Sequence, residues 1–305
     1  MAGFGVGCLQ LALSGGDNLD AIEREIRAAK ARLPWLQMML LPELFCFGVS
    51  TDHAQPMPGP AENRFCALAR ELDIWLIPGS MFEKREGRTY NTSSVIDPSG
   101  AVIARYRKMY PFLPYERGVT AGDEPVVFDV PGVGRFGLSI CYDMWFPETS
   151  RTLAFMGAEV ILHPSLTNTI DREAERAISR ATATTNQCYF LDLNGAGELG
   201  FGRSGFYGPG GEVIWEAGEN REIIALDLDL DYVRRVRRRG WHGLAQSLKS
   251  FRDGPTDFAP YRPGARSPAL DDLGPLEKPM PEAPAAPAGD DVIVSKRTAT
   301  DEAAE

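Results

Sequence analysis

The first 250 or so residues alternate short apolar segments with longer stretches whose apolar residues recur at helical spacing. In one such stretch Leu19, Ile22 and Ala29 share a stripe, and Asp17 or Asn18 can cap the helix, which should run to about residue 33. Apolar segments separated by turns at Asp97–Gly100 and at Pro131-Gly132 indicate antiparallel hairpins between the helical units. This order predicts a layered α/β protein with a mixed rather than wholly parallel sheet. Strands are expected at residues 4–13, 37–41, 74–78, 91–96, 102–106, 126–130, 135–140, 160–162, 188–194, 206–207, 213–215 and 223–228, and helices at 61–72, 147–156, 171–186 and 230–239.

The character of the chain changes after about Phe251. Nine of its 23 prolines lie from Pro255 onward, and residues 281–287 are almost wholly Pro and Ala. Segments of this composition bury too little apolar surface to fold. We therefore expect one folded domain over residues 1–251, an extended arm over 252–275 that packs on a partner subunit, and a disordered tail over 276–305.

Composition excludes several classes of function. The formal net charge of -10 gives no overall basic balance to favour nucleic acid or an anionic membrane. No apolar run approaches the roughly 20 residues of a membrane span. A signal peptide would carry basic residues ahead of its apolar stretch, and this N-terminus has none there. The five cysteines are scattered without a CxxC pair, which indicates neither zinc nor a disulfide framework and favours a reducing cytoplasm.

Three segments place a polar side chain at the end of a predicted strand. Glu43 follows an apolar strand in Leu-Pro-Glu, Lys108 ends a strand in Tyr-Arg-Lys, and Cys141 ends one in Ser-Ile-Cys-Tyr-Asp. Strand-to-helix turns of the last kind hold nucleophiles in many enzymes. Partial burial would raise the pKa of Glu43 toward neutrality and make it an effective base. A thiol with a pKa of about 8.5 needs such a base and a neighbouring cation to attack at neutral pH.

Each of these residues alone has an ordinary interpretation. A glutamate after a strand is usually a cap, a lysine is usually solvated, and a cysteine in an apolar run usually fills the core. Their occurrence as a set, each at a strand end, indicates a catalytic group.

With these residues in this order, the chain resembles the nitrilase superfamily of carbon–nitrogen hydrolases over roughly residues 4–250. The family places a Glu, a Lys and a Cys in that order on a four-layer α-β-β-α sandwich, which implies two mixed sheets here. It carries a second Glu between the Lys and the Cys, and Glu116 in Leu-Pro-Tyr-Glu fits that position.

The resemblance implies a mechanism. Glu43 would take the proton of Cys141, the thiolate would attack a carbonyl carbon, and Lys108 with the backbone N–H of Tyr142 would hold the oxyanion. Glu116 would orient Lys108 or the substrate nitrogen. A thioester would remain until water hydrolyses it. No metal or organic cofactor is required, and a homodimer or larger homo-oligomer is expected.

Residues next to Cys141 narrow the substrate class. Nitrilases of the family typically have Cys-Trp-Glu, whereas this chain has Cys141-Tyr142-Asp143, which favours amides. Carbamoylases often carry arginines just after the cysteine, where this chain has Met144 and Trp145. We therefore expect the substrate to be a small-molecule primary amide with an apolar or aromatic acyl part. N-carbamoyl compounds, and after them nitriles, are the alternative substrates. The expected substrate contacts are Phe112, Tyr142, Met144, Trp145, His163, Thr167 and Asn168.

Several weaker signals have simpler interpretations. His163 either lines the cavity or is a satisfied buried histidine, and the three histidines are not spaced for a metal. The segment Gly202-Arg203-Ser204-Gly205 lacks the spacing of a nucleophile elbow and is expected to be a turn. The arginines between residues 234 and 239 are expected on a solvated helix face or a subunit contact. A non-catalytic binding protein on the same fold is the alternative from a different class, and the intact set of Glu43, Lys108 and Cys141 argues against it.

Overall fold

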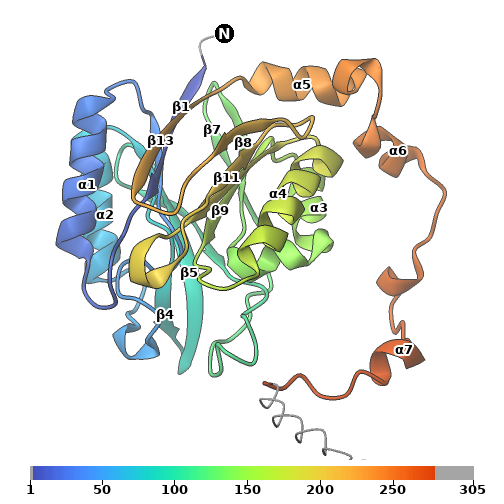
Figure 1. Ribbon diagram of the computed structural model, residues 1–305, viewed down its shortest axis with the longest axis horizontal. Coiled ribbons are helices and arrows are strands. Elements are labelled where there is room, and N and C mark those ends of the chain that lie inside the picture. Colours follow the sequence, from blue (N-terminus) through green and yellow to red (C-terminus); the bar gives the residue numbers. More distant parts are fainter. Residues whose placement is uncertain (1–2, 279–305) are drawn as a thin grey trace, which may run out of the picture.

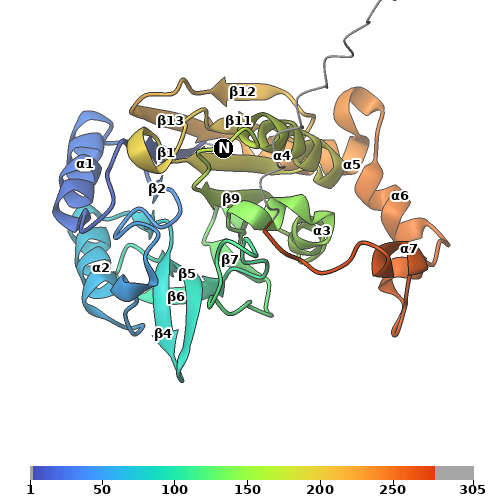
Figure 2. The same ribbon diagram turned by 60° about the horizontal axis from the view of Figure 1, so that its bottom comes forward.

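The computed structural model describes residues 3–278 and shows two mixed sheets, each covered by helices on its outer face (Figures 1 and 2). The first sheet has the order β13-β1-β2-β3-β5-β4, with β6 paired to β5, and the second has the order β12-β11-β10-β9-β8-β7. Parallel pairs at the centre of each sheet and antiparallel pairs at the margins make both sheets mixed. The predicted α-β-β-α architecture is confirmed.

The elements follow the sequence pattern closely. The strands are β1 (Phe4–Gln10), β2 (Met38–Leu40), β3 (Trp75–Ile77), β4 (Met81–Arg85), β5 (Arg88–Ile96), β6 (Val102–Arg107), β7 (Val126–Val130), β8 (Gly134–Leu138), β9 (Val160–Ser165), β10 (Tyr189–Asn194), β11 (Gly205–Tyr207), β12 (Val213–Glu216) and β13 (Glu222–Leu228). The helices are α1 (Leu19–Arg32), α2 (Pro60–Leu72), α3 (Pro147–Phe155), α4 (Arg172–Asn186), α5 (Leu230–Arg239), α6 (Ser247–Asp253) and α7 (Pro268–Asp271). Strand β4 was not expected, because its charged Glu83, Lys84 and Arg85 hide an alternating pattern.

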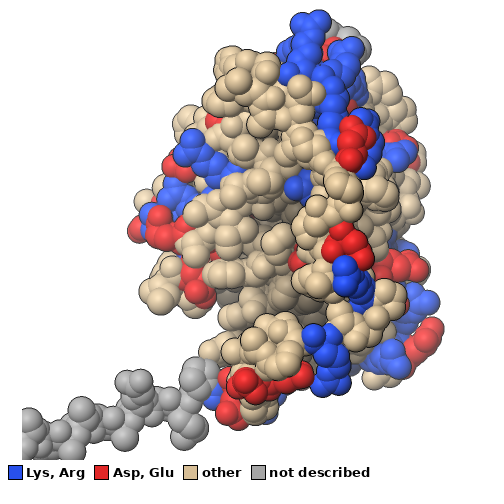
Figure 3. Space-filling view, turned by 90° about the vertical axis from the view of Figure 1, so that its right-hand side faces the viewer, with Lys and Arg blue, Asp and Glu red and all other residues tan. Residues whose placement is uncertain are grey.

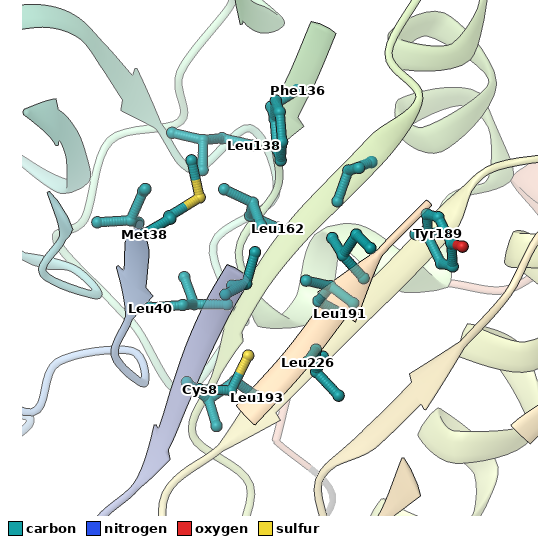
Figure 4. Close-up of a cluster of buried hydrophobic side chains, with 14 of the residues drawn as sticks. Cys8, Met38, Leu40, Phe136, Leu138, Leu162, Tyr189, Leu191, Leu193 and Leu226 are labelled. Atoms are coloured by element: carbon teal, nitrogen blue, oxygen red, sulfur yellow. The ribbon is translucent and has the colours of Figure 1, made fainter. Parts of the chain in front are cut away.

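The core lies between the two sheets. Side chains alternate along β1, so that Phe4, Val6 and Cys8 point toward the second sheet while Leu9 packs under α1 and α2. The facing strands contribute residues such as Leu162 and Leu191 to the same cluster (Figure 4). A third cluster joins α3 and α4 to the outer face of the second sheet. Burial on both faces therefore fixes how the strand ends of the two sheets meet.

The residues after α5 leave the sandwich and pass outside it (Figure 1). Phe251, Phe258 and Tyr261 of this segment line a cavity together with residues of α3 and α4 of the same chain. Phe251 lies over the guanidinium of Arg151, and Tyr261 donates a hydrogen bond to Glu148. The predicted domain boundary at residue 251 falls within α6. The predicted disordered tail lies, from residue 279 onward, outside the described residues. No helix in the described part of the chain is long and apolar enough to cross a membrane.

Packing between the sheets predicts a large cost for truncating Leu162, which is fully buried at the centre of β9. Leu162→Ala should lower the free energy of unfolding by about 2–5 kcal/mol, measured by chemical denaturation. Leu270→Ala, on the exposed face of α7, is the matched control and should change it by less than about 0.5 kcal/mol. Equal losses in the two variants would contradict this account of the core.

Candidate active site

Glu43, Lys108 and Glu116 form one ionic cluster, in which Glu43 and Lys108 are buried and Glu116 is partly exposed. The Lys108 Nζ lies 2.8 Å from Glu43 Oε1 and 2.9 Å from Glu116 Oε2. Lys108 follows β6 directly, and Glu43 follows β2 in the same sheet. The backbone N–H of Glu43 bonds to the carbonyl of Ser165 at the end of β9, which joins this segment to the second sheet. The sandwich thus brings together residues that are far apart in sequence.

Asn91 is a member of this cluster that sequence reasoning missed. Its Nδ2 donates to Glu43 Oε1 at 2.8 Å and to Glu116 Oε1 at 3.4 Å. It lies within β5, and its backbone carbonyl accepts the N–H of Lys108. An asparagine inside a strand carries no motif, so only the pairing of β5 with β6 could have indicated it.

The charges in the cluster shift the pKa of each member. Burial raises the pKa of Glu43, and Glu116 adds to this effect while Lys108 opposes it. Burial alone would lower the pKa of Lys108, but Glu43, Cys141 and Glu116 outweigh it and raise that pKa well above its ordinary value. Lys108 therefore stays a cation, and the raised pKa of Glu43 means that its carboxylate binds a proton more tightly than a solvated glutamate does.

Cys141 sits on a strained turn between β8 and α3. Its φ of 46° lies in the left-handed region that a residue with a Cβ rarely adopts, and such strain is common where a nucleophile is exposed at a strand end. Burial raises the pKa of the Cys141 thiol, Glu43 raises it further, and Lys108 lowers it. The resting side chain is consequently a thiol, and a thiol becomes a good nucleophile only after a base has removed its proton.

Asp143 anchors this turn. Its carboxylate accepts the phenol O–H of Tyr106 at 2.6 Å, the N–H of Ile140 at 2.8 Å and the N–H of Tyr110 at 2.9 Å. The side chain is fully buried, and burial raises its pKa to about 6. In the sequence, Asp143 only helped to indicate the class of substrate. In the structure, its hydrogen bonds hold the turn that positions Cys141.

Two cavity lobes meet at Cys141, and both also contact Phe112 and Leu166. The Glu43 lobe, of about 440 Å³, contains Glu43, Lys108, Tyr115, Glu116 and Arg117. The Glu175 lobe, of about 340 Å³, contains Tyr142, Trp145, Thr167, Asn168, Asp171 and Glu175. Of the predicted substrate contacts, Phe112, Tyr142, Trp145, Thr167 and Asn168 therefore line the cavity.

Met144 and His163 lie outside both lobes. Met144 points into the cluster between α3, α4 and the second sheet, because the one-turn helix after Cys141 directs it away from the cavity. The expected contact of Met144 with substrate is therefore corrected. His163 is fully buried, and its Nδ1 lies 2.6 Å from Ser139 Oγ while its Nε2 has no hydrogen-bond partner among the described residues. His163 therefore does not line the cavity. It is a buried histidine, and one of its two ring nitrogens, Nδ1, has a hydrogen-bond partner.

Arg235, Arg238 and Arg239 lie on the exposed face of α5, as expected, whereas two other arginines of this helix contact the rest of the fold. Arg234 pairs with Glu159 at 2.7 Å, and Arg237 donates to the carbonyls of Ala158 and Gln187. Across residues 3–278, no group of three or more His, Cys, Asp or Glu side chains is arranged to hold a metal ion.

Comparison with known proteins agrees with this geometry. The carbon–nitrogen hydrolase family matches residues 6–238, so the chain belongs to that family and is a carbon–nitrogen hydrolase of the nitrilase superfamily. It is 30% identical to omega-amidase NIT2-B of Xenopus laevis and to human omega-amidase NIT2, over 78% of this chain and 93% of each relative.

Solved structures give the same fold. Nit3 of Saccharomyces cerevisiae, a member of the nitrilase superfamily, has a TM-score of 0.72 at 30% identity, covering 78% of this chain and 94% of that one. A cysteine mutant of the amidase from Nesterenkonia sp. AN1, in complex with butyramide, has a TM-score of 0.67 at 27% identity, covering 78% and 95%. In another mutant of that amidase, acrylamide has added to the active-site cysteine.

The anchoring role of Asp143 predicts that Asp143→Asn disturbs the Cys141 turn. Three donors converge on the carboxylate, so an amide group must turn its NH₂ toward at least one of them. The variant should lose about 1–3 kcal/mol of folding free energy, and the rate at which iodoacetamide alkylates Cys141 should change several-fold. Asp129→Asn, on an exposed ion pair with Arg135, is the control. An unchanged alkylation rate in Asp143→Asn would show that Asp143 does not hold the turn.

Proposed function

We propose that this enzyme hydrolyses a primary amide to a carboxylic acid and ammonia through a thioester on Cys141. The observation that carries the proposal is the cluster of Glu43, Lys108 and Glu116 beside a thiol that opens into the cavity. The butyramide complex of the Nesterenkonia amidase and the named omega-amidases support an amide as substrate.

The first half of the reaction uses Glu43 as a base. Glu43 accepts the thiol proton of Cys141, and the sulfur forms a bond to the amide carbonyl carbon. The carbonyl oxygen becomes an oxyanion, which Lys108 and the backbone N–H of Tyr142 stabilise. Glu43 then returns the proton to the nitrogen, the C–N bond breaks, and ammonia leaves.

In the second half of the reaction, water replaces the thiol as the attacking group, and Glu43 is again the base. Water gives a proton to Glu43 and attacks the thioester carbonyl, the C–S bond breaks, and the sulfur recovers its proton from Glu43. Glu116 bonds to Lys108 and to the backbone N–H of Phe112, so it fixes the ammonium in the position where the oxyanion forms. N-carbamoyl compounds and nitriles remain the alternative substrates in that order.

Removal of the nucleophile tests this proposal. Cys141→Ala should reduce ammonia release from simple amides to the background rate, because no other group can form the thioester. Cys66→Ala removes a partly exposed thiol that does not line the cavity and should retain wild-type turnover. Wild-type turnover in Cys141→Ala would overturn the mechanism.

For matched acyl groups the wild-type enzyme should release more ammonia from amides than from nitriles, and the reverse ratio would indicate a nitrilase.

We further propose that the protein forms a homodimer or larger homo-oligomer through the face of α3 and α4. Phe155 on α3 is 80% exposed, and Phe251, Phe258 and Tyr261 stand beside the same helices. Figure 3 shows this side of the molecule as mostly uncharged across its middle, with charged residues of both signs around it. Exposed apolar patches of this kind favour association.

Light scattering tests the oligomer. The full chain should have at least twice the 33.5 kDa mass of the monomer, and deletion of residues 252–305 should weaken the association. A monomeric mass for the full chain at micromolar concentration would reject the proposal.

A further inference from the structure

A second buried ionic cluster lies against the cavity, on the side away from Lys108. Arg172 Nη1 lies 3.0 Å from Glu175 Oε2, and Arg172 Nη2 lies 2.6 Å from Asp192 Oδ2. All three side chains are at most 4% exposed. The mechanism proposed above uses none of them.

Glu175 connects this cluster to the nucleophile. Its Oε1 accepts the hydroxyl proton of Thr167 at 3.0 Å, and the Thr167 Oγ1 lies 4.0 Å from the Cys141 Sγ. Glu175 also lines the cavity lobe that carries its name. Each carboxylate oxygen of Glu175 has one protein donor and therefore a further lone pair to offer to a ligand.

Arg172 cannot serve as an anion site for substrate. Its guanidinium donates to Glu175, to Asp192 and to the backbone carbonyl of Arg203. It is buried and does not line the cavity. Two carboxylates face one guanidinium, so the cluster carries a formal charge of about -1 when both are ionised.

The remaining charge in the Glu175 lobe is also negative. Asp171 lines it as well, and within the described range 3–278 no lysine or arginine does. A carboxylate entering this lobe would meet like charge without a cation to compensate for its lost hydration, whereas an ammonium would be attracted. Tyr142 and Trp145 also line this lobe, and aromatic rings attract a cation that lies over their faces.

The proton-transfer groups show which part of the substrate occupies this lobe. Glu43 and Glu116 lie in the other lobe, so the nitrogen that receives a proton and leaves must point that way. With the carbonyl carbon at Cys141, the acyl chain then extends into the Glu175 lobe.

We infer that Glu175 determines specificity, and that the preferred amide carries a protonated amine or another hydrogen-bond donor on its acyl chain rather than a carboxylate. This inference rests on the proposed amidase function. The sequence led us to expect a wholly apolar or aromatic acyl part, because Glu175 and Asp171 were not recognisable as cavity residues. With these carboxylates in the cavity, we instead expect an apolar stem that ends in a hydrogen-bond donor.

Three amides of matched length test the inference: 4-aminobutanamide, pentanamide and succinamate, which end in an ammonium, a methyl and a carboxylate. The wild-type kcat/KM should fall in that order, by about tenfold or more from the first to the last, as expected for a charge-assisted hydrogen bond. The difference in kcat/KM between the three amides should come mainly from KM, because the ammonium is bound in the ground state as well as in the transition state.

Substitution of the carboxylate is the second arm of the test. Glu175→Gln keeps a group that can accept the Thr167 hydroxyl but removes the charge, so the ratio of kcat/KM for 4-aminobutanamide to that for succinamate should fall about tenfold. Glu173→Gln lies on the same helix with its side chain 62% exposed, and it should leave the ratio unchanged.

The wild-type series decides the outcome even if Glu175→Gln does not fold. Equal rates for the three amides, or a preference for succinamate, would overturn the inference while the amidase function stands. An absence of ammonia from all three, with pentanamide included, would instead overturn the proposed function. In a folded Glu175→Gln variant, an unchanged ratio would show that Glu175 does not set the preference.

Discussion

A buried lysine ammonium held between one buried and one partly exposed carboxylate is the interaction on which this candidate active site depends. Charges removed from water are stable only when they are paired, and the buried Lys108 is paired with Glu43 and with Glu116 at hydrogen-bond distances. The arrangement contributes little to the stability of the fold compared with an apolar core. Its effect is chemical, because it keeps Lys108 charged and leaves Glu43 as a carboxylate of raised pKa beside Cys141.

The two sheets make this arrangement possible. Lys108 and Glu43 follow strands of the first sheet, whereas Cys141 follows β8 of the second, and the apolar layer between the sheets fixes the distance between them. The buried carboxylate of Asp143 then holds the turn that carries Cys141 in its strained conformation. Strain at Cys141 is thus offset by hydrogen bonds one turn away and by packing throughout the sandwich.

Patterns that are local in sequence predicted the elements and the residues at strand ends. Alternation and helical spacing indicated every strand of the sandwich except β4, whose charged residues hide its pattern, and the family resemblance placed Glu43, Lys108 and Cys141. Features that depend on tertiary contact were not predictable. Asn91 lies within a strand, Arg172 and Glu175 read as ordinary charged residues of an amphipathic helix, and Met144 turns inward only because of the helical turn after Cys141.

The claim central to this account is that Cys141 forms a covalent acyl intermediate. Rapid acid quenching during turnover of an amide, followed by mass spectrometry of the intact protein and its peptides, measures that intermediate directly. The account predicts an adduct on Cys141 whose added mass is that of the amide less ammonia. Steady release of ammonia without an adduct, when hydrolysis of the thioester has been slowed by low temperature, or an adduct on another residue, would contradict it.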